Sequence, residues 1–543
     1  MGNQIFCPGE PENEPVLDYA PGSAERVAIE ARLDSMWNEV PEIPCIVGGK
    51  EIFTGNIRQQ HCPHDHSKVL ARWHAATPEV VKMAVDAANE AWVDWSRTTQ
   101  QVRSAVMERA AVLLSGPWRD ELNASTMLGQ SKTVLQAEID AACELIDFFR
   151  FNNHFALAQI PQEQPLKNPP GVWNHVDHRP LEGFVYAIAP FNFTSIAANL
   201  CCAPVLMGNT AVWKPSKTSI LSNWYAYQML QEAGLPDGVI NFVPGDPVEV
   251  TTAALSSSSF AGLHYTGSTE VFRQLWKQIG NQLQDYRNYP RIVGETGGKD
   301  FIFAHPSADV ASLVTAAVRG AFEYQGQKCS APSRMYVPKS LWPEIKDPLV
   351  EATRSLAMGD VRDFRNFMGA VIEESAFLRL QQAIDQAKED PKCTIIVGGE
   401  CDNSQGWYIS PTIIECEDPK SYSMETELFG PVLSVFVYED SQLDECLDLV
   451  DNTSPYALTG AVFSSDRVAA EAISDRLRYS AGNFYINDKP TGAVVGQQPF
   501  GGARASGTDD KAGSALNLLR WVAPRTVKEN FHPPSDHRYP HMK

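Results

Sequence analysis

Positive charge is scarce in this sequence of 543 residues. Lys and Arg number 45 against 66 Asp and Glu, so the formal net charge at pH 7 is −21. A surface with this charge repels nucleic-acid phosphates and anionic lipid headgroups. We therefore expect no nucleic-acid partner.

The sequence also lacks an apolar run long enough to cross a membrane. A spanning helix needs about 20 mostly apolar residues. Residues 183–213 carry no charge, but Pro190, Asn192, Pro204 and Gly208 interrupt them. A buried strand, a loop, a helix and a second strand are therefore predicted here, and no membrane span is expected.

A paired-cysteine framework is lacking as well, and import into an organelle cannot be read from the first residues. The 11 cysteines are odd in number and have no repeating spacing, which predicts free thiols in a reducing compartment. The first 30 residues are acidic and contain Arg26 as their single basic residue, unlike an Arg-rich transit peptide.

Two common site motifs are absent or incomplete. No GxGxxG sequence stands at a strand-to-helix junction, so an ordinary dinucleotide fingerprint has no support. The run His61–His66 (HCPHDH) has metal-binding residue types, but Pro63 and the lack of a second ligand cluster favour a polar loop. We expect no metal site.

Length and hydrophobic periodicity predict an α/β protein of two or three domains. Residues 1–60 read as an irregular lead-in and 160–180 as an extended arm. Helices are predicted at 80–95, 102–114, 136–149, 195–207, 222–233 and 309–324, and strands at 184–189, 210–213, 239–243, 263–266, 301–303, 394–397 and 432–438. From residue 183 this alternation predicts a parallel sheet with helices on its faces.

Three short motifs follow three of the predicted strands: residues 189–193 (APFNF), 213–216 (WKPS) and 266–268 (TGS). Ligands of parallel sheets bind outside the carboxyl ends of the strands. Lys214 and Ser216 could bond ribose hydroxyls, and Gly267-Ser268 at a helix start could face a pyrophosphate. Each motif by itself could equally be turn chemistry.

Two further motifs supply reactive groups. Glu295 lies between glycines in GETGGK, and Cys329 follows a glycine turn in GQKCS. A thiolate nucleophile with a carboxylate base can carry out acyl-enzyme chemistry. A buried structural cysteine and a surface glutamate remain the alternative for these two residues considered alone.

Together these motifs and Glu427–Pro431 (ELFGP) stand in the order and at about the spacing of the aldehyde dehydrogenase superfamily, which the chain resembles from about residue 14 to 530. Within it the chain is similar to the Δ1-pyrroline-5-carboxylate dehydrogenases. The segments that carry this finer resemblance are 129–140 (GQSKTVLQAEID), 145–152 (LIDFFRFN), 326–331 (GQKCSA) and 481–508, which begins AGNFYIND and ends ARASGT.

The resemblance implies a role for each matching residue. Cys329 would be the nucleophile, Glu295 the general base and Asn192 an oxyanion donor. The residues implied in NAD binding are Ala189, Lys214, Ser216, Gly267, Ser268, Thr269, Glu270, Val271, Glu427 and Phe429. Ser330, Gly492 and Ala493 would bind the substrate α-carboxylate, and Phe193 and Phe500 would enclose its aliphatic part. Lys217 stands where many relatives have Glu, which leaves NAD or NADP open.

The same resemblance implies a Rossmann-like NAD-binding domain (1–155 and 181–296), an α/β catalytic domain (297–495) and a β oligomerisation arm with a C-terminal segment (156–180 and 496–543). It further implies a homodimer or higher homo-oligomer. The mitochondrial matrix is the implied location, with the cytoplasm as the alternative.

The expected activity is the NAD-dependent oxidation of L-glutamate γ-semialdehyde to L-glutamate in proline catabolism. Oxidation of another acidic semialdehyde, such as succinate semialdehyde, is the alternative. A non-catalytic scaffold would not need Cys329, Glu295 and Asn192 together, and a cysteine hydrolase would not need the cofactor motifs.

Overall fold

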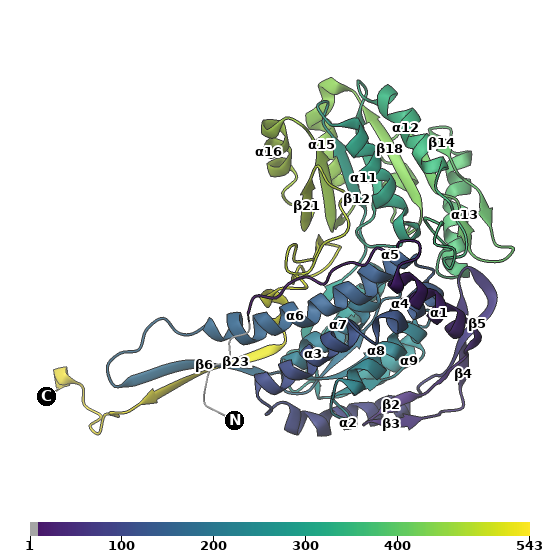
Figure 1. The fold of residues 1–543 in the computed structure, drawn as a ribbon. Helices are drawn as coiled ribbons and strands as arrows, with labels where there is room; N and C mark the ends of the chain where they lie inside the picture. Colours follow the sequence, from purple (N-terminus) through teal and green to yellow (C-terminus); the bar gives the residue numbers. More distant parts are fainter. Residues whose placement is uncertain (1–8, 543) are drawn as a thin grey trace.

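The computed structural model describes residues 9–542, which contain two seven-stranded sheets and a long two-stranded arm (Figure 1). Cys7 and the start of the predicted lead-in lie outside these residues. Within the described range, no helix combines the length and the hydropathy that crossing a bilayer requires.

The first sheet has the order β11-β10-β7-β8-β9-β2-β3 and is parallel from β11 to β9. The three predicted motifs therefore follow three neighbouring strands, β10, β7 and β8. They lie on the side of the sheet where these strands have their carboxyl ends. The strands are β2 (Cys45–Val47), β3 (Lys50–Ile52), β7 (Phe184–Ile188), β8 (Thr210–Lys214), β9 (Ile240–Phe242), β10 (Phe260–Thr266) and β11 (Arg291–Glu295).

Helices cover both faces of this sheet because its strands are apolar on both sides. Phe184 and Tyr186 pack among residues of α2, α9 and α10, whereas Val185 and Ala187 pack among residues of α7 and α8. These helices are α2 (Pro78–Trp95), α7 (Thr194–Leu206), α8 (Ile220–Glu232), α9 (Pro247–Leu255) and α10 (Thr269–Asn281), and α3 (Gln100–Leu114), α4 (Arg119–Gln130) and α6 (Glu144–His154) extend the second layer.

The second sheet has the order β14-β17-β18-β13-β12-β20-β21, and only β14 is antiparallel to its neighbour. Its strands are β12 (Asp300–Ala304), β13 (Pro332–Pro338), β14 (Cys393–Val397), β17 (Thr412–Cys416), β18 (Val432–Tyr438), β20 (Thr459–Phe463) and β21 (Asn483–Ile486). The helices α11 (Val310–Phe322) and α12 (Trp342–Arg354) pack on one face, and α13 (Glu374–Glu389), α15 (Leu443–Asn452) and α16 (Arg467–Arg476) on the other.

The arm pairs β6 (Val172–Pro180) with β23 (Val522–Asn530) along nine antiparallel positions. It projects from the body beside the first sheet, and the described C-terminal residues lie at its far end (Figure 1). The predicted extended arm at 160–180 is therefore present, although residues 160–171 are mostly loop.

The prediction of an irregular lead-in over residues 1–60 is wrong beyond residue 23. Helix α1 (Ala24–Asn38) begins at the cap Ser23 and buries Ile29, Leu33 and Met36, and β1 (Glu42–Ile43), β2, β3 and β4 (Ile57–Cys62) follow. Residues 9–20 are indeed irregular. In Figure 1 this dark purple segment runs along α6, between the two sheets.

The predicted helix at 136–149 is interrupted. Helix α5 (Val134–Ala137) passes into a π-helical turn, η1 (Glu138–Cys143), before α6 begins. This turn directs Glu138 into the interior, where its side chain is fully buried. The local sequence is helical throughout, so the change of pitch results from tertiary contacts.

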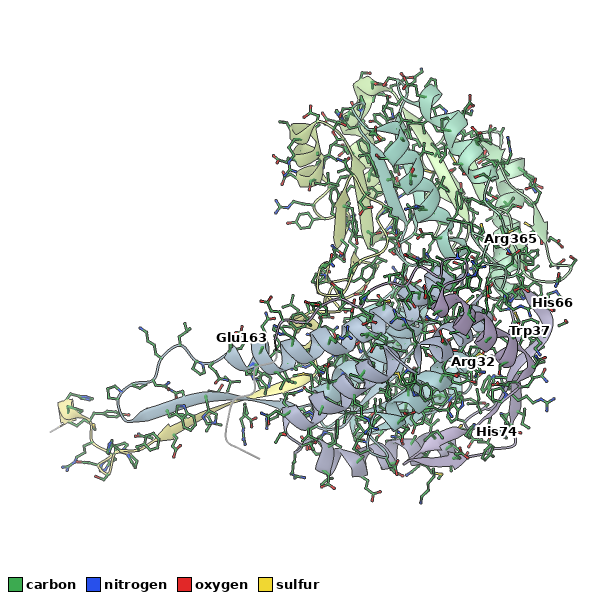
Figure 2. All side chains as sticks on the ribbon, in the orientation of Figure 1. Arg32, Trp37, His66, His74, Glu163 and Arg365 are labelled. Atoms are coloured by element: carbon green, nitrogen blue, oxygen red, sulfur yellow. The ribbon has the colours of Figure 1, made fainter. Side chains whose placement is uncertain are left out.

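The His61–His66 run, predicted as a polar loop, lies mostly in strands: His61 and Cys62 end β4, Asp65 and His66 begin β5 (Asp65–His74), and only residues 63–64 form the turn, near the outer edge where Figure 2 labels His66. His61 Nδ1 and His66 Nε2 lie 2.9 Å from the carbonyl oxygens of His66 and Asn403, respectively. Within residues 9–542, no group of three or more His, Cys, Asp or Glu could hold a metal ion.

Candidate active site

One cavity of about 240 Å³ lies between the two sheets and contains predicted catalytic and substrate-binding residues. It is lined by two of the three predicted catalytic residues, Cys329 and Glu295, but not by Asn192, and it is also lined by every predicted substrate residue: Phe193, Ser330, Gly492, Ala493 and Phe500. These residues come from widely separated parts of the chain, so the fold itself brings them together.

Cys329 is placed by a tight turn after α11. Tyr324, Gln325 and Gly326 all have left-handed φ angles, of 52°, 55° and 66°. A Cβ on Gly326 would lie 2.4 Å from the carbonyl oxygen of Gly430, so this position requires glycine. The turn leaves Cys329 partly exposed in the cavity wall.

The acidity of both reactive groups is weakened by their surroundings. Burial, with the nearby acids Asp300, Glu295 and Glu427, raises the pKa of the Cys329 thiol well above its ordinary value. Burial likewise raises the pKa of Glu295, whose Oε2 accepts a hydrogen bond from the Gly502 N–H at 3.2 Å. The surroundings of both groups therefore favour the protonated form more than water would.

Asn192 is held at the loop that precedes Cys329. Its Nδ2 donates to the Gln327 carbonyl at 3.0 Å, and its side chain is buried. Gln327 in turn accepts a hydrogen bond on Oε1 from the Ile372 N–H at 2.9 Å. The Asn192 amide thus lies beside the backbone that leads to Cys329, and the sequence did not indicate that the Gln327 carbonyl holds it there.

The predicted carboxylate anchor combines a hydroxyl with open backbone. Ser330 Oγ lies 2.8 Å from Thr491 Oγ1, and Gly492 has a φ of +92°, which allows the chain to turn without a Cβ. Thr491 also lines the cavity. Thr491 immediately precedes the predicted pair Gly492 and Ala493. Its position in the sequence could therefore have predicted that it lines the cavity.

A buried charged side chain, Lys132, lies behind the apolar part of the cavity wall. The ammonium of Lys132 lies 4.2 Å from the centre of the Phe193 ring and 4.3 Å from that of Tyr324, within range of a cation–π interaction. Lys132 also pairs with Asp140 at 2.5 Å. These contacts fix the Phe193 ring that lines the cavity.

A second cavity, of about 730 Å³, contains Ala189, Lys214 and Ser216 at the ends of β7 and β8. Lys214 is buried, its Nζ donates a long bond of 3.4 Å to the Pro215 carbonyl, and burial lowers its pKa to about 8. A buried ammonium with so weak a protein partner suits ribose hydroxyls. These residues therefore fit the adenosine part of a dinucleotide.

Glu427 and the GETGGK motif meet where the two sheets approach each other. Glu427 Oε1 accepts from the Gly298 N–H at 2.9 Å, and a Cβ on Gly297 would lie 2.0 Å from Glu427 Oε2. Because Gly297 has no Cβ, the Glu427 carboxylate fits beside it. Phe429 has a φ of 53° and packs edge-on against Phe191 at 5.8 Å between ring centres.

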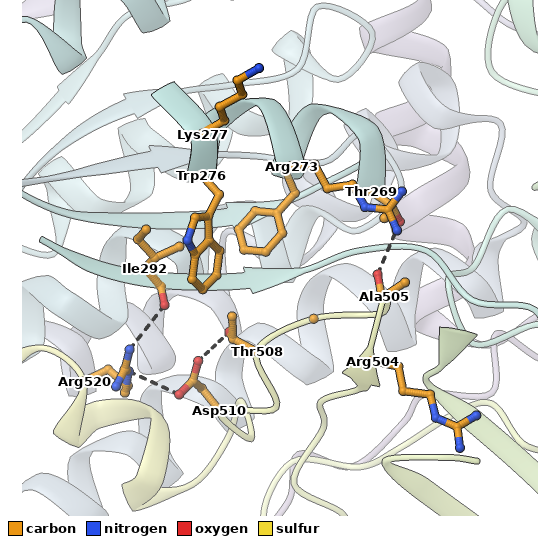
Figure 3. A pocket seen from close by; sticks show the side chains of 12 residues that line it. Thr269, Arg273, Trp276, Lys277, Ile292, Arg504, Ala505, Thr508, Asp510 and Arg520 are labelled. Atoms are coloured by element: carbon orange, nitrogen blue, oxygen red, sulfur yellow. Dashed lines mark hydrogen bonds and ion pairs between the residues drawn. The ribbon is translucent and has the colours of Figure 1, made fainter. Parts of the chain in front are cut away.

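The structure does not bring all predicted cofactor residues to the Lys214 cavity. The Gly267 N–H donates to the Glu295 carbonyl, and Ser268 caps α10 by accepting from the Val271 N–H at 3.3 Å. The Thr269 side chain instead lines a separate cavity of about 740 Å³, with Arg273 and Trp276 (Figure 3).

Glu270 and Val271 are also turned away from the Lys214 cavity. Glu270 Oε1 accepts from Gln274 on the exposed side of α10, and Val271 is 43% exposed. Any contact of residues 269–271 with a cofactor in that cavity would therefore involve backbone N–H groups at the start of the helix.

Comparison with known proteins gives consistent results. A sequence model described as "Aldehyde dehydrogenase family" matches residues 54–527. "Delta-1-pyrroline-5-carboxylate dehydrogenase, mitochondrial" of Dictyostelium discoideum is 54% identical over 534 residues, which cover 98% of this chain and 96% of the relative. The human protein of the same name is 47% identical over 532 residues, with coverages of 98% and 94%.

Solved structures give the same picture. The crystal structure of the Delta-pyrroline-5-carboxylate dehydrogenase from Mycobacterium tuberculosis bound with NAD has a TM-score of 0.96, a sequence identity of 51% and full coverage of both chains. The fold and the arrangement of elements described above are thus those of an experimentally determined relative.

Proposed function

This chain belongs to the aldehyde dehydrogenase family, and we propose that it oxidises L-glutamate γ-semialdehyde, the hydrolysed form of Δ1-pyrroline-5-carboxylate, to L-glutamate. The activity belongs to proline catabolism and uses NAD. The observation that carries this function is the near-full-length similarity to relatives named for it, in a chain whose cavity gathers Cys329, Glu295 and the predicted anchor residues.

The chemistry begins at Cys329. Its thiolate forms a bond to the aldehyde carbon, and the carbonyl oxygen of the resulting thiohemiacetal becomes an oxyanion. The Asn192 amide and the Cys329 N–H are the proposed donors to that oxygen, and one such donor is worth about 3 kcal/mol of transition-state stabilisation. NAD, when bound, supplies the hydride acceptor that converts the thiohemiacetal to a thioester.

Glu295 acts in the second half of the reaction. Its carboxylate removes a proton from a water molecule, the water oxygen bonds to the thioester carbon, and the carbon–sulfur bond breaks. The products are the new carboxylic acid, which loses its proton to solvent, the Cys329 thiolate and protonated Glu295. The raised pKa of Glu295 suits this role, since it makes the carboxylate a better proton acceptor near neutral pH.

For the cofactor, Lys214 and Ser216 are the proposed ribose contacts, with Ala189 beside them. Glu427 and Phe429 would hold the nicotinamide ribose, and residues 267–271 (Gly267, Ser268, Thr269, Glu270 and Val271) the pyrophosphate side through the start of α10. Lys217 Nζ is paired with Glu373 at 2.8 Å. This pairing offsets the positive charge that a 2′-phosphate would need and supports NAD over NADP.

For the substrate, Ser330, Gly492 and Ala493 are the proposed α-carboxylate anchor, and Phe193 and Phe500 enclose the aliphatic chain. The supporting observation is that all five line one cavity with Cys329. Small residues at 492 and 493 leave backbone N–H groups open to an anion, which needs several donors when buried.

The domain division and assembly are proposals of the same kind. The NAD-binding domain would comprise 1–155 and 181–296, the catalytic domain 297–495, and the arm with the C-terminal segment 156–180 and 496–543. The projecting β6–β23 ribbon supports a homodimer or higher homo-oligomer, because an isolated two-stranded ribbon is marginally stable in water. Relatives named as mitochondrial support the mitochondrial matrix, with the cytoplasm as the alternative.

A turnover assay tests the proposed activity. Pyrroline-5-carboxylate, succinate semialdehyde and acetaldehyde are compared, each with NAD and with NADP. We expect the highest kcat/KM for pyrroline-5-carboxylate with NAD. A higher value for succinate semialdehyde would instead support the alternative substrate.

A further inference from the structure

The outer wall of the substrate cavity is built partly by a segment that the family comparison does not include. Asn13, Glu14 and Val16 line the same cavity as Cys329, although the family match begins at residue 54. We refer to residues 13–19 as the N-terminal strap. The strap therefore lies outside the range that matches the general family model, although the full-length structural match extends over it.

The strap is fixed at its base by buried ion pairs. The Glu14 carboxylate contacts Arg119 Nη1 at 2.5 Å and Arg150 Nη1 at 2.8 Å. The fully buried Glu138 pairs with Arg119 and accepts hydrogen bonds from Leu17 N–H at 2.9 Å. Tyr19 also donates to Glu138, at 2.8 Å. This network holds the strap in place without any contribution from Asn13.

Asn13 connects the strap to the loop that carries the proposed anchor. Its Nδ2 donates both to Asp147 Oδ2 on α6 and to the Val495 carbonyl, each at 2.8 Å, although Asn13 and Val495 are 482 positions apart. Its Oδ1 accepts from Gln497 Nε2 at 2.9 Å. The Glu14 N–H donates to the other oxygen of Asp147, at 2.7 Å.

Val495 and Gln497 continue the loop in which Gly492 and Ala493 lie. This loop has left-handed glycines at both 492 and 496, with φ angles of +92° and +83°, so its backbone is not held by regular secondary structure. The side-chain amide of Asn13 thus braces a loop whose backbone N–H groups must converge on the substrate carboxylate. An error of about 1 Å in such positioning is costly.

We propose that Asn13 is a positioning residue for substrate recognition: by bridging α6 and the 492–497 loop, it holds the anchor at the distance from Cys329 that an acidic semialdehyde requires. The proposal rests on the proposed function, because it assigns the anchor to residues 492 and 493. It predicts that Asn13 affects carboxylate-bearing substrates and not short aldehydes, which do not reach the loop.

The test uses Asn13→Ala and the isosteric Asn13→Asp, which keeps the shape but lacks the Nδ2 donor. For the loss of a hydrogen bond of ordinary strength, we expect the KM for glutamate γ-semialdehyde to rise about five- to ten-fold in Asn13→Ala. The rise should be at least as large in Asn13→Asp, which places a carboxylate beside Asp147. In both variants kcat should stay within about two-fold, and kcat/KM for propanal should not change.

Asn38→Ala is the matched control, since Asn38 Nδ2 donates only within α1, to the Asp34 carbonyl at 2.8 Å, as far as residues 9–542 show. It should leave both substrates unaffected. Gln497→Ala removes the outermost bond of the bridge and provides a second variant if Asn13→Ala does not fold. It should raise the same KM by a smaller factor.

Three results would overturn the proposal: wild-type KM for the semialdehyde in Asn13→Asp, an equal loss of activity toward both aldehydes, or the same effect in Asn38→Ala. These outcomes are distinct from a failure of the proposed function. If the unmodified enzyme did not turn over the semialdehyde with NAD, the function would be wrong, whereas normal wild-type turnover with unaffected variants would remove only the role of Asn13.

Discussion

Replacing Ala493 with leucine should exclude the proposed substrate while leaving simpler aldehydes to react. Ala493 lines the 240 Å³ cavity next to Gly492, whose left-handed conformation turns the backbone there. The larger side chain would occupy the space in front of the backbone N–H groups. The α-carboxylate could then no longer reach them, whereas the aldehyde end, at Cys329, would remain accessible.

The size of the effect follows from the hydrogen bonds that are lost. A hydrogen bond to a charged group contributes about 1.5–3 kcal/mol, so losing one or two to the carboxylate should cost ~3 kcal/mol. Each 1.4 kcal/mol corresponds to a factor of ten, which gives a rise in KM of roughly a hundred-fold. Propanal has no carboxylate, and its weak activity should persist.

The quantity to measure is the ratio of kcat/KM for glutamate γ-semialdehyde to kcat/KM for propanal, with NAD binding checked by titration. Damage to folding or to the cofactor site would lower both values together and leave the ratio unchanged. Ala472→Leu, on the exposed face of α16, controls for the added hydrophobic bulk. An unchanged ratio in a folded, NAD-binding Ala493→Leu variant would refute the placement of the anchor.

Four further predictions concern the reactive groups and the base of the strap. Cys329→Ser should abolish dehydrogenase turnover but retain NAD binding, because an alcohol does not supply the anion that a thiol does; normal turnover would disprove the mechanism. In Glu295→Gln the pre-steady-state burst of NADH should survive better than steady-state turnover, and an equal fall of both would place Glu295 in an earlier step. Since the pKa of the Cys329 thiol is raised and the first step needs the thiolate, kcat/KM should increase from neutral to alkaline pH; a flat profile would contradict this. Arg119→Met leaves Glu138 buried without its partner and should lower the free energy of unfolding by about 3–5 kcal/mol, measured by denaturant titration, whereas a loss below about 1 kcal/mol would show that Glu138 is satisfied without it.

Much of the fold was accessible from local sequence patterns. The helices at 80–95 and 102–114 correspond to α2 and α3, and the motif-bearing strands to β7, β8 and β10. Period and strand length are local properties, so they can be read from a few consecutive residues. The spacing of Ile29, Leu33 and Met36 and the cap Ser23 were also readable signals, and they could have predicted α1.

For the candidate site as well, some properties could be predicted from the sequence and others could not. The sequence determined which chemical groups are available, because Cys329, Glu295 and Lys214 lie in distinctive local motifs at the ends of strands or after tight turns. The sequence did not show that the Thr269 side chain faces a different cavity from the one that contains Lys214. The direction of a side chain at a helix start depends on how that helix packs, which the motif does not record.

Only the tertiary structure revealed the bridge between Asn13 and Val495. An asparagine in an irregular segment has no periodicity and no motif, and its partner is a backbone carbonyl 482 positions away. Likewise, the π-helical turn at 138–143 contains Glu138, which belongs to a buried ionic network with Arg119 that the local sequence does not record. The sequence by itself determined the local elements and the reactive groups, whereas long-range hydrogen bonds and ion pairs, which form only once those elements are packed, decided the shape of the substrate cavity.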